Sequence, residues 1–176
     1  MSDMEYLKKP SEFTWDGLGD IALGRESLGN SMPVLVYRLF QYTLRDILNR
    51  EVGGEKAAAL YRAAGNLAGM EFAKNVLDLT GDIDHFISNL QRTLFDLKVG
   101  ILNIEKADLE TLQLVLTVSE DLDCSGLPIV GETVCDYDEG FIAGILEVYT
   151  GKVFDVKEID CWATGDRTCR FTAKPV

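Results

Sequence analysis

The chain has 176 residues and a formal net charge of −12 at pH 7. A length of this order suits one domain with a full hydrophobic core, and the 47% of hydrophobic residues argues against a disordered chain. The acidic balance argues against negatively charged partners, so we expect neither nucleic acid nor a membrane surface to be bound.

The first residues, MSDMEYLKKPSEF, lack the apolar segment of a secretory signal, and no apolar run approaches the length of a membrane span. We therefore expect a cytoplasmic protein whose four cysteines are reduced thiols, available as ligands. Residues 1–30 show little periodicity and are expected to form an N-terminal arm, with short strands near Phe13–Leu23. The folded domain is expected over residues 31–176.

Three helices are predicted next. The first has Ser31 as its N-cap, Pro33 in its first turn and Gly53–Gly54 at its end. It begins the expected core, and one face carries its apolar residues: Val36, Leu39, Phe40, Leu44, Ile47 and Leu48.

The second helix, over residues 54–78, has Gly65 and Gly69 on one face. This spacing indicates close packing against another helix more than room for a ligand or a partner. The third helix has Asp82 or Asp84 as its cap. Its apolar stripe comprises Ile83, Phe86, Ile87, Leu90, Leu94 and Leu97.

The period then changes to that of strands. Two strands are predicted in ILNIEKA and TLQLVLTVSED, followed by a loop over residues 121–133. A fourth helix in VCDYDEGFIAGILEVYTG is capped by Asp136 and ended by Gly151. Two further strands flank the turn Thr164–Asp166. This order predicts an α+β fold, with an antiparallel sheet of four to five strands packed against a helical layer.

The last hairpin places Cys161 opposite Cys169, if its loop is Thr164–Asp166. Opposed side chains on one face could form half of a tetrahedral zinc site, a disulfide, or a pair of small core residues. Cys135, at the start of the fourth helix, could be a third thiolate, since a helix N-terminus lowers a thiol pKa. Glu158 could be a fourth ligand, but only if a bulge turns it to the same face as Cys161.

Two segments together carry a family resemblance. VCDYDEGFIAGIL and EIDCWATGDRTCRF resemble the C-terminal half of the 4-vinyl reductase domain family, whose pattern is V-C-x-Y-x-x-G-F-x-x-G followed by E-x-x-C-x-x-x-G-x-x-x-C-x-F. The helix with Gly65 and Gly69 resembles the matching N-terminal element. The resemblance covers roughly residues 30–175, and the positions that match the pattern are Cys135, Tyr137, Gly140, Phe141, Gly144, Glu158, Cys161, Gly165, Cys169 and Phe171.

The resemblance implies a fold similar to haem-type nitric oxide sensors and to a Golgi tethering subunit, with a hydrophobic cavity between helices and sheet and a tendency to form homodimers. The domain is also the sensor module of phenol- and toluene-responsive regulators, where three cysteines and a glutamate bind zinc. By that match, the zinc ligands here would be Cys135, Glu158, Cys161 and Cys169, which implies a bent strand at Glu158. Four protein ligands indicate a structural ion.

A ligand pocket is also implied. In the phenol sensors a histidine upstream of the first zinc cysteine binds the phenol hydroxyl, which makes His85 the corresponding candidate. The expected pocket walls are Phe72, Phe86, Leu94, Leu114 and Trp162; each of them alone is more typical of an ordinary core.

Two functions of different classes follow. The first is a stand-alone zinc-containing sensor domain that binds a small hydrophobic or aromatic molecule and signals through a separate partner chain. The second is a 4-vinyl reductase, or an accessory subunit, acting in tetrapyrrole metabolism of the bacteriochlorophyll type. No dinucleotide-binding glycine motif is visible in the sequence, and no catalytic residue is assigned, so the first is favoured. A third possibility is an assembly protein that dimerises through a helical face including Gly65 and Gly69.

Overall fold

The computed structural model describes residues 13–176. Internal contacts divide the chain after Pro33 into two units. The described part of the first unit contains a 3-10 helix, η1 (Trp15–Leu18), and a short helix, α1 (Ile21–Gly24). The strands expected near Phe13–Leu23 are therefore wrong. The Thr14 and Asp20 side chains instead accept backbone N–H groups three residues ahead, a local bonding that favours helical turns over strands.

The second unit, Val34–Val176, contains a four-stranded antiparallel sheet in the order β1-β2-β4-β3, as predicted. Inward and outward residues alternate along the last strand, where Cys169, Phe171 and Ala173 are buried. The strands are β1 (Ile101–Asp108), β2 (Gln113–Ser119), β3 (Phe154–Asp160) and β4 (Cys169–Pro175).

Four long helices accompany the sheet, close to their predicted bounds. Asp82 caps α4, since its Oδ1 atom accepts the His85 N–H at 3.0 Å. For α5 the expected cap, Asp136, is the first helical residue, and Cys135 takes the cap position. The helices are α2 (Val34–Val52), α3 (Gly54–Val76), α4 (Ile83–Asp96) and α5 (Asp136–Thr150). Within residues 13–176, none of the helices combines the length and apolarity that crossing a membrane requires.

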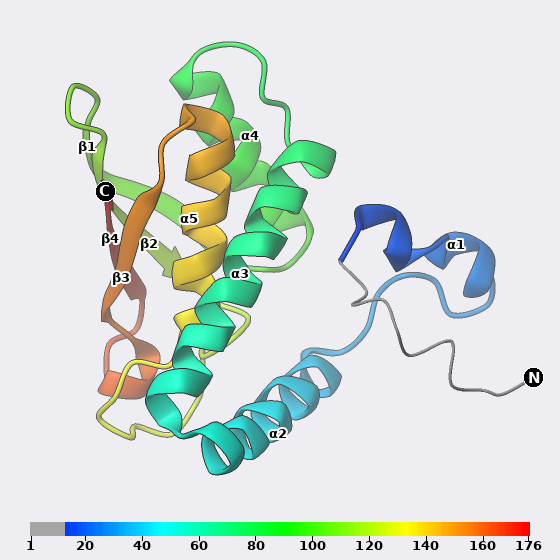
Figure 1. The fold of residues 1–176 in the computed structure, drawn as a ribbon. Coiled ribbons are helices and arrows are strands. Elements are labelled where there is room, and N and C mark those ends of the chain that lie inside the picture. Colours follow the sequence, from blue (N-terminus) through cyan, green and yellow to red (C-terminus); the bar gives the residue numbers. More distant parts are fainter. Residues whose placement is uncertain (1–12) are drawn as a thin grey trace, which may run out of the picture. The chain divides into compact units, whose positions relative to one another are not determined.

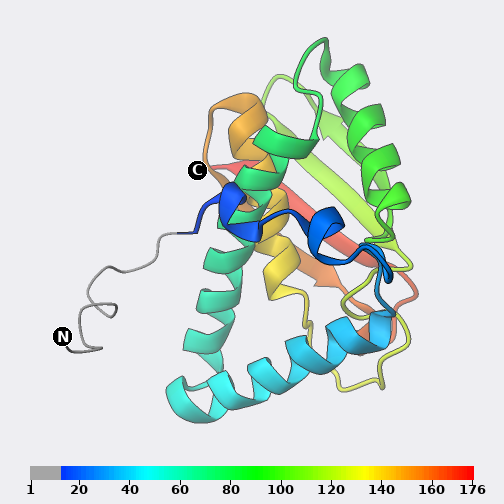
Figure 2. The same ribbon diagram turned by 90° about the vertical axis from the view of Figure 1, so that its right-hand side faces the viewer.

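The helices α4 and α5 lie over the sheet, and α3 packs along α5 (Figures 1 and 2). The core lies between these layers. Its aromatic centre includes Phe86 of α4, which stacks on Tyr149 of α5 with ring centroids 3.8 Å apart, and the fully buried Phe171 of β4.

Glycines set the close approach of α3 and α5. A Cβ atom added at Gly65 would lie 2.0 Å from the Tyr137 carbonyl oxygen, and one added at Gly140 would lie 2.0 Å from the Arg62 carbonyl oxygen. Gly69 and Gly144 meet backbone in the same way. Close packing within the chain therefore accounts for the glycine pair of α3. Because these glycines are occupied by α5, they do not form a dimerisation face.

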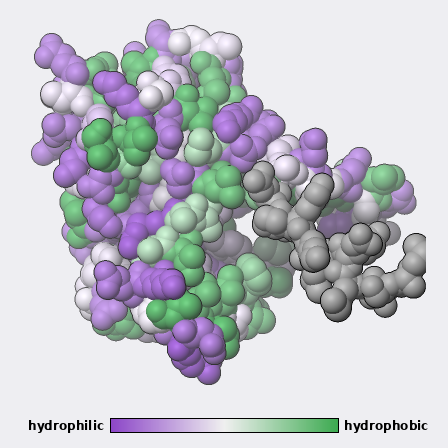
Figure 3. All heavy atoms as spheres, in the orientation of Figure 1, coloured by the Kyte–Doolittle hydropathy of each residue, from purple (hydrophilic) through white to green (hydrophobic). Residues whose placement is uncertain are grey.

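The helix α2 directs its polar side to the rest of the domain. Gln41 is buried and Tyr37 half-buried, whereas Leu35 is 75% exposed and Phe40 68% exposed. Hydrophobic side chains accordingly appear at the surface over α2, in the lower part of Figure 3. The predicted apolar stripe of this helix is thus mostly outside the core.

Candidate metal centre and ligand cavity

Four buried thiols meet at one point of the domain. They come from the loop after β2 (Cys124), the cap of α5 (Cys135), the end of the β3 segment (Cys161) and the start of β4 (Cys169). Their Sγ atoms all lie within 4.8 Å of one another. The cluster therefore connects four segments that are far apart in the sequence.

The spacing of these thiols can be compared with that of a tetrahedral zinc site, in which a Zn–S bond of about 2.3 Å places sulfur atoms about 3.8 Å apart. The Cys135 Sγ atom lies 3.9 Å from the Sγ atoms of both Cys161 and Cys169. The Cys124 and Cys169 Sγ atoms are closer, at 3.0 Å, and all four cysteines are free thiols. Number, chemistry and spacing of the donors thus fit a four-coordinate soft metal.

The hairpin that holds two of these cysteines is bent as the sequence predicted. Its register shifts between Glu158 and Asp160, and this bulge turns both Glu158 and Cys161 inward. Beyond the bulge, Asp160 pairs with Arg170, so the register leads to Cys161 beside Cys169. The turn is closed by Thr164, whose hydroxyl accepts the Cys161 N–H at 3.0 Å.

Glu158 lies beside the thiol cluster. Its Oε2 atom accepts the Cys135 N–H at 3.0 Å, whereas its Oε1 atom is buried and has no partner within residues 13–176. Burial, and next the charge of Cys161, raise the pKa of Glu158 to about 8. Of the predicted ligand set, the structure brings Cys135, Cys161 and Cys169 together and adds Cys124, while Glu158 supports the Cys135 backbone.

The thiols share protons unevenly when no ion separates them. The pKa of Cys161 is lowered, first by hydrogen bonding to Cys124 and then by the other two thiols. The pKa of Cys135 is raised, first by hydrogen bonding to Cys124 and further by burial. A single thiolate is therefore favoured at Cys161, stabilised by neighbouring S–H donors. This differs from the expectation that the helix N-terminus makes Cys135 the preferred thiolate.

The loop that carries Cys124 is held by α2. The Asp121 Oδ1 atom accepts the N–H groups of Asp123 and Cys124, which fixes the turn. The Asp123 carboxylate accepts the Tyr37 hydroxyl at 2.7 Å and the Gln41 amide at 2.6 Å. The polar side of α2 therefore positions a cysteine of the cluster.

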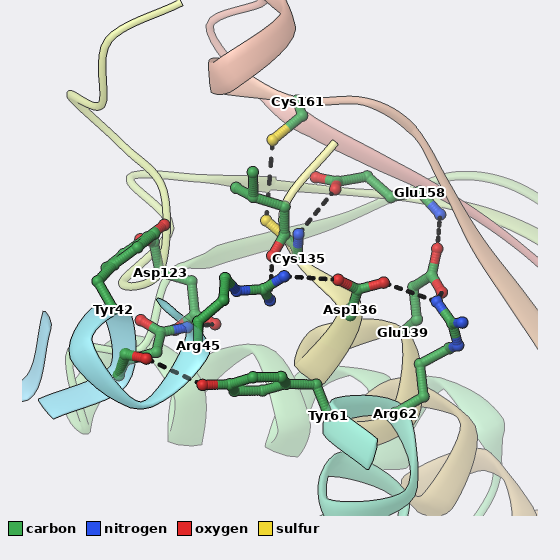
Figure 4. A network of polar contacts seen from close by, with 12 residues as sticks. Tyr42, Arg45, Tyr61, Arg62, Asp123, Cys135, Asp136, Glu139, Glu158 and Cys161 are labelled. Atoms are coloured by element: carbon green, nitrogen blue, oxygen red, sulfur yellow. Dashed lines mark hydrogen bonds and ion pairs between the residues drawn. The ribbon is translucent and has the colours of Figure 1, made fainter. Parts of the chain in front are cut away.

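The start of α5 is fixed by two arginines from other helices. Arg45 of α2 lies 2.8 Å from Asp136, and Arg62 of α3 lies 2.6 Å from the other oxygen of the same carboxylate. The Glu139 carboxylate continues this network, since its Oε1 atom accepts the Glu158 N–H. Figure 4 shows how the network joins three helices to the residues around Cys135.

An apolar cavity of about 80 Å³ lies between α4, α5 and the sheet. This volume is several times what one water molecule needs. Three predicted wall residues, Phe86, Leu94 and Leu114, line it. The polar side chains in its wall are Asp121 and Asp138, whose carboxylate oxygens lie within 4.8 Å of each other and of the Cys135 Sγ atom. The cavity therefore adjoins the thiol cluster.

The other predicted pocket residues lie elsewhere. His85 is on the outer side of α4, where its Nε2 atom lies 3.1 Å from Asp78 and half of its side chain is exposed. Phe72 packs on Phe141 at the α3–α5 contact. Trp162 donates its Nε1–H to the Leu127 carbonyl oxygen and faces Arg167. The structure does not bring these three side chains to the cavity.

Sequence reasoning missed Cys124, Asp121 and Asp138. For Cys124 a signal existed, because a chain with four cysteines offers a complete tetrahedral set. For Asp121 and Asp138 there was none, since a single aspartate in a loop or at a helix start is typical of a cap.

Comparison with known proteins gives relatives over nearly the whole chain. An uncharacterized protein of Methanocaldococcus jannaschii is 28% identical over 172 residues, which are 98% of this chain and 92% of the relative. A second uncharacterized protein of the same organism is 26% identical over 153 residues, or 86% of this chain and 83% of the relative.

Solved structures share the fold at low identity. The phenol-responsive sensory domain of the transcription activator PoxR, solved with phenol, has a TM-score of 0.63 and 17% identity, over 84% of this chain and 76% of that one. A vinyl-4-reductase family protein of M. jannaschii has a TM-score of 0.56 and 19% identity, over 88% and 90%. A trafficking protein particle complex subunit 3 of Naegleria fowleri, covalently bound to palmitic acid, has a TM-score of 0.61 and 12% identity, over 81% and 94%.

These likenesses confirm the predicted fold class. The family comparison addresses the part of the chain that contains β2, α5 and the cysteine hairpin, and there residues 114–175 match the model of the 4-vinyl reductase domain. Residues 114–175 therefore belong to the 4-vinyl reductase domain family, and the resemblance that the sequence indicated is confirmed.

Proposed function

We propose that this chain is a sensor-type domain that binds a small hydrophobic or aromatic molecule in the cavity between α4, α5 and the sheet, beside a structural zinc ion. The observation that carries the proposal is the adjacency of the two sites. Asp121 and Asp138 belong to the cavity wall, and their oxygens lie within 4.8 Å of the Cys135 Sγ atom.

Zinc is the ion that the donors suit best. Cys124, Cys135, Cys161 and Cys169 are buried and would fill all four positions of a tetrahedral site, which leaves no open position for a substrate. When bound, the ion would supply a cross-link between the loop after β2, α5 and the last hairpin. Its role would be structural, and Glu158 would orient Cys135 through the backbone N–H group.

The same geometry offers a route from the cavity to the surface. Asp121 contributes to the cavity wall and also fixes the turn that presents Asp123 to Tyr37 and Gln41 of α2. A molecule that displaces Asp121 would therefore act on α2, and through it on a partner chain.

The exposed side of α2 supports a homodimer. Leu35, Leu39 and Phe40 are 75%, 64% and 68% exposed, and contiguous apolar surface of this kind is typical of protein interfaces. We expect Phe40→Glu to convert a dimer to a monomer in sedimentation velocity, with Asn49→Glu on the same helix as the control. A wild-type protein that sediments as a monomer at all concentrations would overturn this part of the proposal.

Ligand binding is tested by thermal stabilisation with toluene and phenol. A ligand of the folded state stabilises by about 2.7 kcal/mol at a hundredfold excess over its Kd. Ile87→Phe, which adds a ring to the cavity wall, should abolish the effect, whereas Val153→Phe, at an exposed position outside the wall, should leave it intact. Equal stabilisation of both variants, or none of the wild type by any aromatic, would contradict the proposal.

A further inference from the structure

The cavity is chemically one-sided. Its wall is built from aliphatic and aromatic side chains except at Asp121 and Asp138, which come from the loop after β2 and from the first turn of α5. A molecule in the cavity would therefore meet apolar contacts along its body and carboxyl oxygens at one end.

The Asp138 carboxyl lacks a partner there. Its Oδ2 atom is shut off from solvent and makes no hydrogen bond within residues 13–176, and the surrounding protein encloses the group completely. A buried acceptor without a partner costs on the order of 1–3 kcal/mol. Such groups are rare in folded proteins, and where one occurs it commonly bonds to a small molecule or an ion instead of to the protein.

The charges around Asp138 indicate what that partner is. The ionisable groups that act on it are Asp121, Asp123, Glu158 and Cys124, all of them acidic. The nearby arginines are engaged elsewhere, Arg45 and Arg62 with Asp136 and Arg38 with the Leu122 and Asp121 carbonyls. A ligand carboxylate at this end would add another negative charge to a buried acidic group, whereas an O–H or N–H donor would satisfy the free oxygen.

We infer that the ligand of this cavity carries a hydrogen-bond donor, a hydroxyl or an amino group, on an apolar body, and that Asp138 receives this donor. The inference rests on the proposed function and narrows it. Carboxylate-headed molecules, such as free fatty acids, are excluded from the cavity by the same geometry.

The test uses four single-ring probes of similar size: phenol, aniline, toluene and benzoate. Their dissociation constants for the full-length wild-type protein are measured by calorimetry. Phenol, aniline or both should bind on the order of tenfold or more tightly than toluene, since the donor satisfies a buried acceptor. Benzoate should not bind. Comparison of phenol with aniline then identifies whether the hydroxyl or the amine is preferred.

Two variants assign the effect to Asp138. Asp138→Leu should remove the preference for phenol over toluene, and toluene should bind this variant at least as well as the wild type. Asp138→Asn keeps a carbonyl acceptor and should retain most of the preference. If Asp138→Leu does not fold, the Asn variant and the wild-type series still decide.

Different outcomes bear on the inference and on the proposed function. Binding of benzoate as tight as that of phenol, or equal affinity for toluene and both donors, would overturn the inference while leaving a hydrophobic-ligand domain in place. A preference that persists unchanged in Asp138→Leu would also overturn it. Failure of all four probes to bind would instead count against the proposed function.

Discussion

Replacing Gly69 by alanine should destabilise the domain, although alanine is the better helix former. The added Cβ atom would lie 2.1 Å from the Phe141 carbonyl oxygen and 2.9 Å from its carbon. Ordinary contacts begin near ~3.5 Å, and backbone cannot rotate away, so α3 and α5 must separate by more than about 1 Å. This movement would reach the α5 residues that line the cavity and cap the thiol cluster.

The magnitude follows from two opposing effects. Alanine gains about 1 kcal/mol of helix propensity over glycine. Overpacking of a close contact costs roughly 1–3 kcal/mol, and the loss of dispersion along the opened helix interface adds to it. Because the clash here is with backbone, we expect a net loss of about 1–2 kcal/mol.

The assay is urea unfolding followed by circular dichroism, with free zinc held constant. Gly54→Ala in the same helix is the matched control, because its Cβ atom meets nothing within 4 Å and its backbone conformation suits any residue. The control should be neutral or slightly stabilising. If Gly69→Ala proves as stable as Gly54→Ala, the packing explanation of the glycine pair is refuted.

Three further predictions concern the site and its frame. Cys124→Ser should abolish tight zinc retention, whereas Glu158→Gln should weaken it by about 10–100-fold, since Glu158 supports a ligand without joining the four-thiol set; competition with a chromophoric chelator measures both, and the reverse order would restore the glutamate as a ligand. In the metal-free protein, burial raises the pKa of Asp121 from its ordinary value of 3.8 to about 7, so the folded state binds this proton more tightly and stability should fall as the pH rises from about 4 to about 7. Asp121→Asn should flatten this slope in urea titrations at several pH values, and an unchanged slope would count against the assignment. Asp82→Ala should cost about 1 kcal/mol by loss of the α4 cap, and an unaltered urea midpoint would show that the cap is not needed.

Local signals in the sequence predicted much of the fold. The cap at Asp82 and the stop at Gly151 are both present, because such positions depend on neighbours in the chain. The bulge at Glu158 was predictable from parity, since two inward residues three apart cannot share a face of a regular strand. The strand prediction near Phe13–Leu23 failed because the side-chain caps at Thr14 and Asp20 outweighed its apolar content.

What the sequence could not provide was the direction in which α2 faces. Its apolar residues do form a stripe, but Tyr37 and Gln41 on the opposite side bind the Asp123 carboxylate, and this long-range contact decides which side is buried. The same contact explains why Cys124 was missed. Its loop has no periodicity, and its place in the cluster depends on an anchor from a helix far upstream.

The candidate pocket was half predictable for a similar reason. Phe86 and Leu94 reach the cavity because the amphipathic pattern of α4 fixes its inner face. His85 lies next to Phe86 in the chain, and the helical period of about 3.6 residues turns it outward to Asp78. A resemblance in position along the chain therefore did not translate into a place in the cavity.

The central claim is that four thiols of one chain hold one zinc ion. Native mass spectrometry of reduced, untagged protein, compared with the same sample under denaturing conditions, tests it most directly. We predict one zinc per chain in the native spectrum, lost on unfolding, and no zinc in Cys124→Ser. A wild-type protein that is folded and metal-free, or one that keeps its zinc in Cys124→Ser, would contradict the four-thiol site.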